Sequence, residues 1–136
     1  MLGRPYGVEG VIERGARRGH TIGFPTANLR PVNRVIPRYG VYATATLWDG
    51  VWRQSITNIG VRPTFEHTAE PSIETYIFDF DEDIYGDVIR VRFIYRIRDE
   101  RKFNGPEELK LQISKDVLRA RNFFERHAVK NLLQKL

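Results

Sequence analysis

Apolar and polar residues alternate with a period of two through the middle of the chain, over roughly residues 40–98. A period of two is the repeat of a β-strand, whose successive side chains point to opposite faces. The clearest run has an inward set (Ile89, Val91, Phe93, Tyr95 and Ile97) and an outward set (Arg90, Arg92, Ile94, Arg96 and Arg98). This part of the chain therefore predicts a series of strands.

The first 40 residues predict mostly loop around one strand, because they hold seven of the 11 glycines and four of the seven prolines. That strand is expected to run through Val8 to Ile12 and to end near Gly15. Two strands, 41–48 and 51–59, then flank Asp49-Gly50. Asp-Gly between two such runs is typical of a tight hairpin, because both central residues of its turn need a positive φ.

A helix is predicted to begin at Pro106, whose missing N–H costs nothing at the first helical position. Apolar residues then recur at helical spacing, at Leu109, Ile113, Val117 and either Ala120 or Phe124. Five or six strands followed by one long helix favour an antiparallel barrel capped by the helix. We expect a single domain, 1–136, with the barrel over about 6–98 and the helical part over about 105–136.

Composition narrows the class of protein. A chain of 136 residues suits one compact domain. Apolar runs never exceed three residues, whereas a membrane helix needs about 20, and the start lacks the apolar stretch of a signal peptide. The absence of cysteine excludes disulfide scaffolds and thiolate metal sites and fits a cytoplasmic protein.

The net charge of +5 lies entirely in residues 1–40, which hold seven arginines against two acidic residues. Residues 66–87 are the opposite, with eight acidic residues and no Lys or Arg. A short cationic segment suits a small anion such as a triphosphate better than a long polyanion. The charge therefore marks a candidate nucleotide site.

Residues 10–28 could form a phosphate-binding loop. Four glycines allow backbone N–H groups to approach an anion closely, and Arg14, Arg17 and Arg18 add charge beside them. The spacing is neither a Walker A loop nor a Rossmann fingerprint. The alternative is a solvated barrel loop whose glycines form turns.

Thr26 and Asn28 are candidate metal ligands. They are two residues apart, so in extended backbone their side chains point the same way. Their neutral oxygens suit a Mg²⁺ ion that keeps water and nucleotide phosphates in its shell. The alternative is a turn in which these side chains bond their own backbone.

Glu74 is the candidate general base. It belongs to a predicted strand, 73–80, on the face with Tyr76, Phe78 and Phe80 that is expected to point inward. A carboxylate is costly to bury unless it is paired or functional, and burial would raise its pKa and suit it to accept a proton from a hydroxyl group. The alternatives are a strand-end residue that reaches water and a partner for an arginine.

Several short motifs then follow one another over about residues 2–121. They are Leu2-Gly-Arg-Pro-Tyr6, Gly19-His-Thr-Ile-Gly-Phe-Pro-Thr-Ala-Asn-Leu29, Tyr39-Gly-Val-Tyr-Ala43, Asn58-Ile-Gly-Val-Arg-Pro-Thr-Phe65, Ile73-Glu-Thr75, Ile77-Phe-Asp-Phe80, Ile84-Tyr-Gly86, Ile97-Arg-Asp-Glu-Arg-Lys-Phe103 and Gln112-Ile113 with Asp116. In this order they resemble the riboflavin kinase (flavokinase) family, most of all the kinase module of bacterial bifunctional FAD synthetases.

The resemblance implies a six-stranded antiparallel Greek-key barrel with a C-terminal α-helix packed against it. It also implies an enzyme, a phosphotransferase that moves the γ-phosphate of ATP to the ribityl 5′-hydroxyl of riboflavin, giving FMN and ADP with Mg²⁺. Glu74 matches the catalytic base, and Thr26 and Asn28 match the Mg²⁺ positions. The implied ATP-binding residues are Arg14, Gly15, Gly19, His20, Phe24, Pro25, Thr26, Asn28 and Tyr85, and the implied flavin-binding residues are Arg98 and Arg101.

Two departures from the family pattern are visible. His20 stands where many relatives carry Lys or Arg, so charge on the phosphates could come from Arg17 or Arg18. Relatives often carry an upstream FMN adenylyltransferase domain, and this chain begins where the linker to that domain would be, so we expect either a single-activity kinase or an excised module. We expect ATP and riboflavin as partners, with no nucleic acid and no membrane. The alternatives are a non-catalytic flavin-binding barrel and a nucleic-acid-binding barrel.

Overall fold

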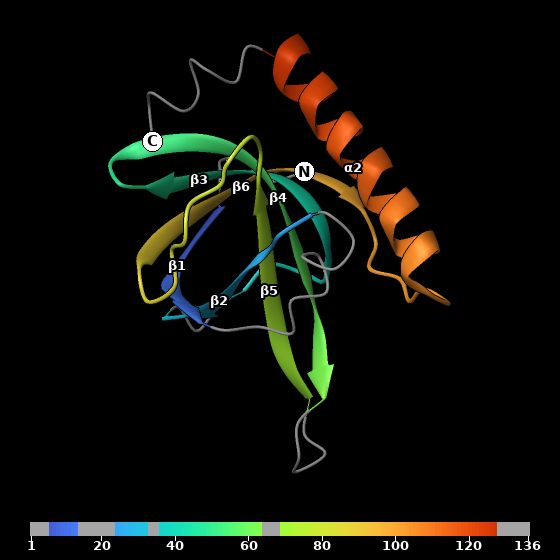
Figure 1. The fold of residues 1–136 in the computed structure, drawn as a ribbon, viewed down its shortest axis with the longest axis horizontal. Coiled ribbons are helices and arrows are strands. Elements are labelled where there is room, and N and C mark those ends of the chain that lie inside the picture. The colour runs from blue at the N-terminus through green and yellow to red at the C-terminus, as the bar shows by residue number, and fades with distance from the viewer. Residues whose placement is uncertain (1–5, 14–23, 33–35, 64–68, 128–136) are drawn as a thin grey trace.

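The computed structural model describes residues 6–13, 24–32, 36–63 and 69–127 and contains six strands and one long helix (Figure 1). The elements are β1 (Tyr6–Glu13), β2 (Ala27–Pro31), β3 (Gly40–Trp48), β4 (Val51–Pro63), β5 (Ala69–Ile77), β6 (Val88–Arg98) and α2 (Pro106–Arg126). The predicted helix start at Pro106 is confirmed.

The strands close into an antiparallel barrel in the order β1-β2-β5-β4-β3-β6. The consecutive strands β3, β4 and β5 are neighbours, and β6 returns to pair with β3, which is a Greek-key arrangement. Helix α2 lies along the outside of this barrel (Figure 1). The predicted fold class, a six-stranded antiparallel barrel with a C-terminal helix, is confirmed.

The hairpin between β3 and β4 turns at the predicted Asp49-Gly50, with φ of 52° and 74°. The prediction of a single strand in residues 1–40 is wrong, because β2 pairs with β1 and β5. β2 is only five residues long and includes Pro31, so it has too few alternating positions to stand out from a loop. Gly10 allows these strands to approach, since a Cβ there would overlap the carbonyl of Arg30.

The barrel interior combines an apolar core with a chain of hydroxyl groups. The apolar core is formed by Val8, Ile12, Leu29, Tyr42, Ile59, Ile73, Ile77, Ile84, Ile89, Val91 and Phe93. The hydroxyls hydrogen-bond in the order Thr46, Ser55, Thr44, Thr57 and Thr75, at 2.7–2.9 Å between oxygens. Because each hydroxyl can both donate and accept, these five polar side chains are buried with partners.

β5 presents its faces differently from the prediction. Ile73, Thr75 and Ile77 point into the barrel, so the face with Glu74 is the outer one, and the inward placement of Glu74 is wrong. The strand also ends at Ile77 and not at Phe80, since the left-handed backbone of Asp79 (φ 54°) breaks it. Both faces of β5 contact apolar neighbours, so alternation separates two sets of side chains without revealing which set lies inside.

β6 shows a second difference. Ile89, Val91 and Phe93 are inside as predicted, but Tyr95 and Ile97 pack with the cluster under α2. The pairing of β6 with β3 shifts register twice over this stretch. A bulge adds one residue to a strand, so that beyond the bulge the other set of side chains points inward. A prediction from a strict period of two does not include such a change.

Helix α2 covers an apolar patch on the outer face of the barrel. Both Ala120 and Phe124, which the sequence left as alternatives, are buried there, and Phe124 packs edge-on against Phe78 at 6.4 Å. Phe123 stacks on Tyr95 at 4.6 Å between ring centroids. Within the described ranges, no helix is long and apolar enough to cross a membrane.

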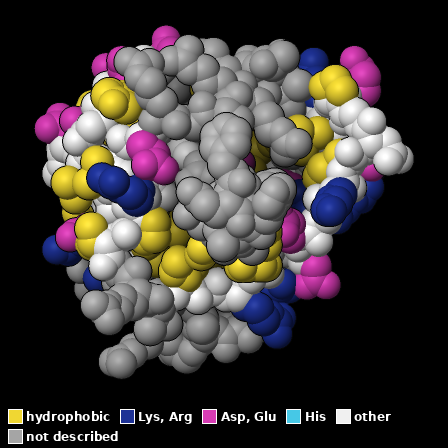
Figure 2. All heavy atoms as spheres, turned by 90° about the horizontal axis from the view of Figure 1, so that it is seen from below, with side chains coloured by type: hydrophobic (Ala, Val, Ile, Leu, Met, Phe, Trp, Pro, Cys, Tyr) yellow, Lys and Arg dark blue, Asp and Glu magenta, His cyan; other side chains and the backbone are white. Residues whose placement is uncertain are grey.

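The described surface mixes charges of both signs. On the face shown in Figure 2, acidic and basic side chains occur among hydrophobic ones. Ion pairs join Arg90 to Glu9 at 3.0 Å and Arg121 to Asp79 at 3.3 Å. Surface pairs of this kind contribute little to stability, but they place acidic groups next to basic ones.

Candidate active site

One residue from each strand forms a row around the outer face of the barrel. The pairing registers place the members opposite one another in the order Glu13, Asn28, Glu74, Asn58, Val41 and Arg98. Directly opposed residues in antiparallel strands share a face. This outer row therefore brings two carboxylates, two amides and a guanidinium together from five distant parts of the sequence.

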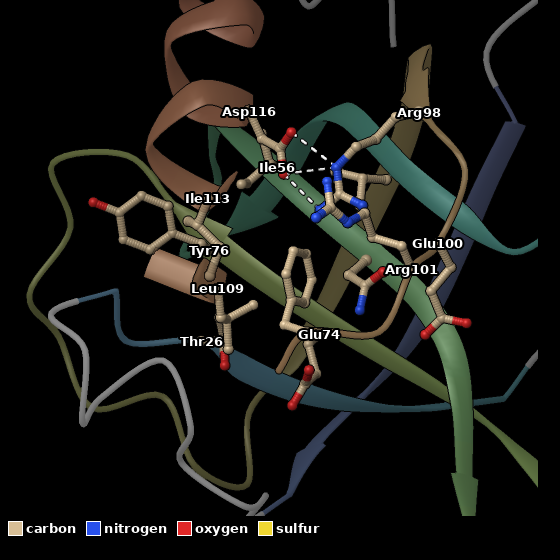
Figure 3. A pocket seen from close by; sticks show the side chains of 13 residues that line it. Thr26, Ile56, Glu74, Tyr76, Arg98, Glu100, Arg101, Leu109, Ile113 and Asp116 are labelled. Carbon is tan, nitrogen blue, oxygen red and sulfur yellow. Dashed lines mark hydrogen bonds and ion pairs between the residues drawn. The ribbon is translucent and has the colours of Figure 1, made fainter. Parts of the chain in front are cut away.

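A pocket of about 120 Å³ lies between this outer face, the first half of α2 and the segment 100–103. Its lining includes Thr26, Val41, Ile56, Asn58, Glu74, Tyr76, Arg98, Glu100, Arg101, Phe103, Leu109, Ile113 and Asp116. Figure 3 shows Thr26 and Glu74 at one end and the Arg98–Asp116 pair at the other. The pocket thus has polar ends and apolar side walls.

Arg98 and Asp116 join the end of β6 to the middle of α2. Nη2 of Arg98 lies 2.8 Å from Oδ2 of Asp116, and Nε donates to both carboxylate oxygens at 3.0 and 3.1 Å. Gln112 donates a further hydrogen bond to Asp116 at 3.0 Å. Asp116 is only 2% exposed, so this pair holds the helix against the barrel at the pocket wall.

The segment after β6 is tied to α2 by Arg101. Nη2 of Arg101 pairs with Glu108 at 3.0 Å, and Nη1 donates to Gln112 at 3.2 Å. The guanidinium of Arg101 also lies 4.8 Å from the centre of the Phe103 ring, a cation–π distance. These contacts hold Phe103 as one wall of the pocket.

Of the twelve predicted site residues, four line the pocket, one is buried beside it, four lie outside the described residues and three lie elsewhere. Thr26, Glu74, Arg98 and Arg101 line the pocket. Asn28 is buried beside it, opposite Glu74. Four predicted ATP-binding residues, Arg14, Gly15, Gly19 and His20, lie outside the described residues.

The other three predicted ATP-binding residues lie near the pocket or away from it. Phe24 packs edge-on against Tyr76, a pocket residue, at 5.4 Å. Pro25 is exposed just before β2. Tyr85 is 55% exposed and is not among the pocket residues. It belongs to the connection between β5 and β6, where Gly86 bonds the backbone of Ile12.

The side-chain oxygens of Thr26 and Asn28 are suitable ligands for a magnesium ion. Thr26 lines the pocket just before β2, and Asn28 lies two residues further, on the outer face with Glu74 opposite. Two neutral oxygens beside a carboxylate are hard ligands, which Mg²⁺ accepts when phosphates and water complete its octahedral shell. The residues at this end of the pocket are therefore compatible with a nucleotide-bound magnesium ion.

Asn58 and Asp116 are among the pocket residues for which the sequence predicted no role. Asn58 belonged to a quoted motif without a role, and only the strand register shows that it is next to Glu74. Asp116 carried a usable signal, because it lies between Ile113 and Ala120 on the apolar stripe of the helix. A carboxylate on a buried face is the argument that singled out Glu74, and it applied equally to Asp116.

The closed barrel and its outer pocket define a small β-barrel protein with a polar ligand site. A family model described as riboflavin kinase (flavokinase) matches residues 2–124. The bifunctional riboflavin kinase/FMN adenylyltransferase of Bacillus subtilis (strain 168) is 44% identical over 127 residues, which cover 91% of this chain and 40% of that protein. The chain belongs to the riboflavin kinase (flavokinase) family.

Two solved structures resemble this one. A crystal structure described as a macrolide-efflux protein from Streptococcus pneumoniae has a TM-score of 0.81 at 36% identity, covering 88% of this chain and 40% of that chain. Riboflavin kinase from Trypanosoma brucei has a TM-score of 0.64 at 19% identity, covering 96% and 86%, and supports the fold alone. The chain thus spans about 40% of the length of the curated relatives it matches.

Proposed function

We propose that this chain transfers the γ-phosphate of ATP to the 5′-hydroxyl of riboflavin, giving FMN and ADP. The observation that carries the proposal is the position of Glu74. In a chain of the riboflavin kinase family, this carboxylate lines a pocket between two amide residues, Asn28 and Asn58. A carboxylate held in such a pocket suits proton transfer from an alcohol.

Glu74 acts as the general base. The 5′-hydroxyl oxygen forms a bond to the γ-phosphorus, the bond from that phosphorus to the β,γ-bridging oxygen breaks, and the hydroxyl proton passes to the carboxylate of Glu74. Phosphoryl transfer depends mainly on positioning and on charge stabilisation. The carboxylate therefore has two tasks, orienting the hydroxyl and accepting its proton.

The phosphates lie at the end of the pocket that Thr26 lines, beside the buried Asn28. These two residues would hold Mg²⁺, which when bound draws charge from the phosphate oxygens. The predicted glycine-rich segment, with Arg14, Gly15, Gly19 and His20, contacts the ATP phosphates in this proposal. Phe24, Pro25 and Tyr85 keep their predicted place near the nucleotide.

The isoalloxazine ring lies along the apolar part of the pocket. Tyr76, Phe103, Leu109 and Ile113 supply apolar walls there, which suit a flat aromatic ligand. Arg98 and Arg101 border the same space and are the proposed flavin-binding residues. Since Arg98 already makes three hydrogen bonds to Asp116, it acts mainly by fixing the wall that the flavin contacts.

The test is direct synthesis of FMN. The protein is incubated with riboflavin, ATP and Mg²⁺, and FMN and ADP are separated and quantified, with parallel reactions that omit ATP or Mg²⁺. We expect equal amounts of FMN and ADP, and no FMN without ATP. Folded protein that binds riboflavin but makes no FMN would instead support a non-catalytic flavin-binding barrel.

The same assay tests the extent of the activity. The curated relatives are bifunctional and longer, and this chain covers 40% of the Bacillus subtilis protein. We propose that this chain supplies only the kinase step, in the cytoplasm, and works beside an FMN adenylyltransferase domain. Prolonged incubation with excess ATP should then accumulate FMN without FAD.

A further inference from the structure

Asn58 carries an unexplained polar atom in the wall of the pocket. Its Oδ1 is buried and has no hydrogen-bond partner within the part of the chain that the structure describes. A buried acceptor without a partner costs free energy, and such atoms are rare in native proteins. This oxygen therefore needs a hydrogen-bond donor from outside the described residues.

The other buried side-chain atoms of the described residues that have no hydrogen-bond partner are explained by their surroundings. Two other buried polar atoms lack a partner among the described residues, Nε of Arg53 and Nε of Arg96. Both belong to guanidinium groups over aromatic rings, at 5.1–5.9 Å from the ring centres, where a cation–π interaction stabilises them. Asn58 is neutral, so a cation–π interaction cannot stabilise its oxygen in this way.

The charged donors in the pocket are already used. Arg98 donates to Asp116 and to the carbonyl of Asp99. Arg101 donates to Glu108 and Gln112. A hydroxyl group of a bound ligand is a donor that could reach the pocket from solvent and bond to Asn58.

The strand register places Asn58 next to Glu74. Asn58 and Glu74 are opposite one another on β4 and β5, on the same outer face, with strands about 4.8 Å apart. Both residues line the pocket. A polyol chain carries hydroxyls on successive carbons, so one ligand can present one hydroxyl to Glu74 and another to Asn58.

We propose that Oδ1 of Asn58 accepts a hydrogen bond from an inner hydroxyl of the ribityl chain and so sets the terminal hydroxyl beside Glu74. This inference rests on the proposed riboflavin kinase function, because it takes riboflavin as the ligand. Asn58 is then a substrate-binding residue that distinguishes a flavin with a polyol side chain from one without it.

The test compares Asn58→Ala with the wild-type protein for two flavins. Riboflavin carries the ribityl chain, whereas lumiflavin has the same ring system with a methyl group in its place. Binding is measured by flavin fluorescence. We expect the Kd for riboflavin to rise about 3- to 10-fold, the loss of one neutral hydrogen bond, and the Kd for lumiflavin to stay unchanged. Asn122→Ala, on the exposed face of α2, is the matched control and should bind both flavins as the wild type does.

Thermal unfolding without ligand separates binding from a structural role. Removing an unpartnered buried acceptor should leave the Tm of Asn58→Ala equal to or above that of the wild type, whereas loss of a structural hydrogen bond would lower it. Equal weakening for both flavins, or unchanged riboflavin binding, overturns the inference. If the Ala variant does not fold, Asn58→Ser is measured in the same way, with the same selective loss expected.

The FMN assay keeps this inference distinct from the proposed function. Wild-type protein that binds riboflavin without making FMN refutes the kinase proposal, while the comparison of the two flavins still decides the role of Asn58. Wild-type protein that makes FMN, with Asn58→Ala binding riboflavin equally well, refutes only the role of Asn58. Wild-type protein that binds no riboflavin refutes both.

Discussion

Glu74 has an amide residue opposite it on each neighbouring strand, Asn28 on β2 and Asn58 on β4. We expect Glu74→Gln to retain riboflavin binding, because the side chain keeps its size and one of its two acceptor oxygens. Turnover should fall by about 10²- to 10⁴-fold, the usual contribution of a general base. Steady-state FMN formation together with riboflavin titration measures both quantities.

The matched control for this change is Glu82→Gln, in the exposed connection after β5. It removes the same charge from a residue that does not line the pocket and should leave turnover unchanged. Wild-type turnover in Glu74→Gln would remove Glu74 from the role of base. Equal losses in the two variants would point to net charge as the cause.

Thr26 and Asn28 are proposed to act on the metal and nucleotide. We expect Asn28→Ala to weaken the apparent affinity for Mg·ATP by about 10-fold or more, since a ligand to the ion is lost, with little change in riboflavin affinity. The measurement is the KM for ATP over a series of Mg²⁺ concentrations. An unchanged KM at every concentration would contradict metal binding by Asn28.

Asn28 is only 4% exposed, so its replacement could also disturb the barrel. Thr26→Ala provides the second test, because Thr26 is less buried and precedes β2. Thr26→Ala should also weaken the apparent affinity for Mg·ATP. Circular dichroism of both variants before the assay establishes that the barrel has formed.

At the scale of elements, the Arg98–Asp116 pair determines where α2 meets the barrel. Either residue alone would be a partly buried charge without its partner, so Arg98→Met and Asp116→Leu should each lower the free energy of unfolding by about 3 kcal/mol. The double variant should lose less than the two single losses together, because neither charge is then left alone. Urea unfolding of the four proteins gives the coupling energy.

Additive losses in that cycle would show that the two side chains act independently. If the single variants do not fold, the milder pair Arg98→Lys and Asp116→Asn is used, since both keep polar contact while losing the paired geometry of the guanidinium and carboxylate. Arg90→Met, whose surface partner Glu9 is well exposed, is the control and should change stability by less than about 1 kcal/mol.

The elements that the sequence predicts best are those with a local physical cause. The hairpin turn needs positive φ at Asp49 and Gly50, and α2 begins at Pro106, so a few adjacent residues determine each feature. β2 and the register shifts of β6 depend on pairing with distant strands. Pairing with a distant strand does not alter the alternation of apolar and polar residues within one strand, so that alternation does not reveal it.

At the scale of the whole molecule, the site depends on closure of the barrel. The outer row takes one residue from each of six strands, and its order follows from the barrel order and not from the order of the chain. Glu74 and Thr26 could be named from the sequence because motifs carried them. Asn58 could not be placed beside Glu74 until the register of β4 and β5 was known.

The net charge of +5 leads to the last prediction, which separates a nucleotide site from a nucleic-acid surface. The described surface pairs arginines with acids, as at Arg90–Glu9 and Arg121–Asp79, whereas an oligonucleotide-binding barrel presents a basic groove with stacking aromatics. We expect no saturable binding of a fluorescent single strand of about 12 nucleotides at micromolar protein. An excess of this strand should not slow FMN formation, whereas ADP should compete with ATP. Saturable binding that falls steeply between low and moderate salt, together with absent FMN formation, would replace the kinase proposal with the nucleic-acid alternative.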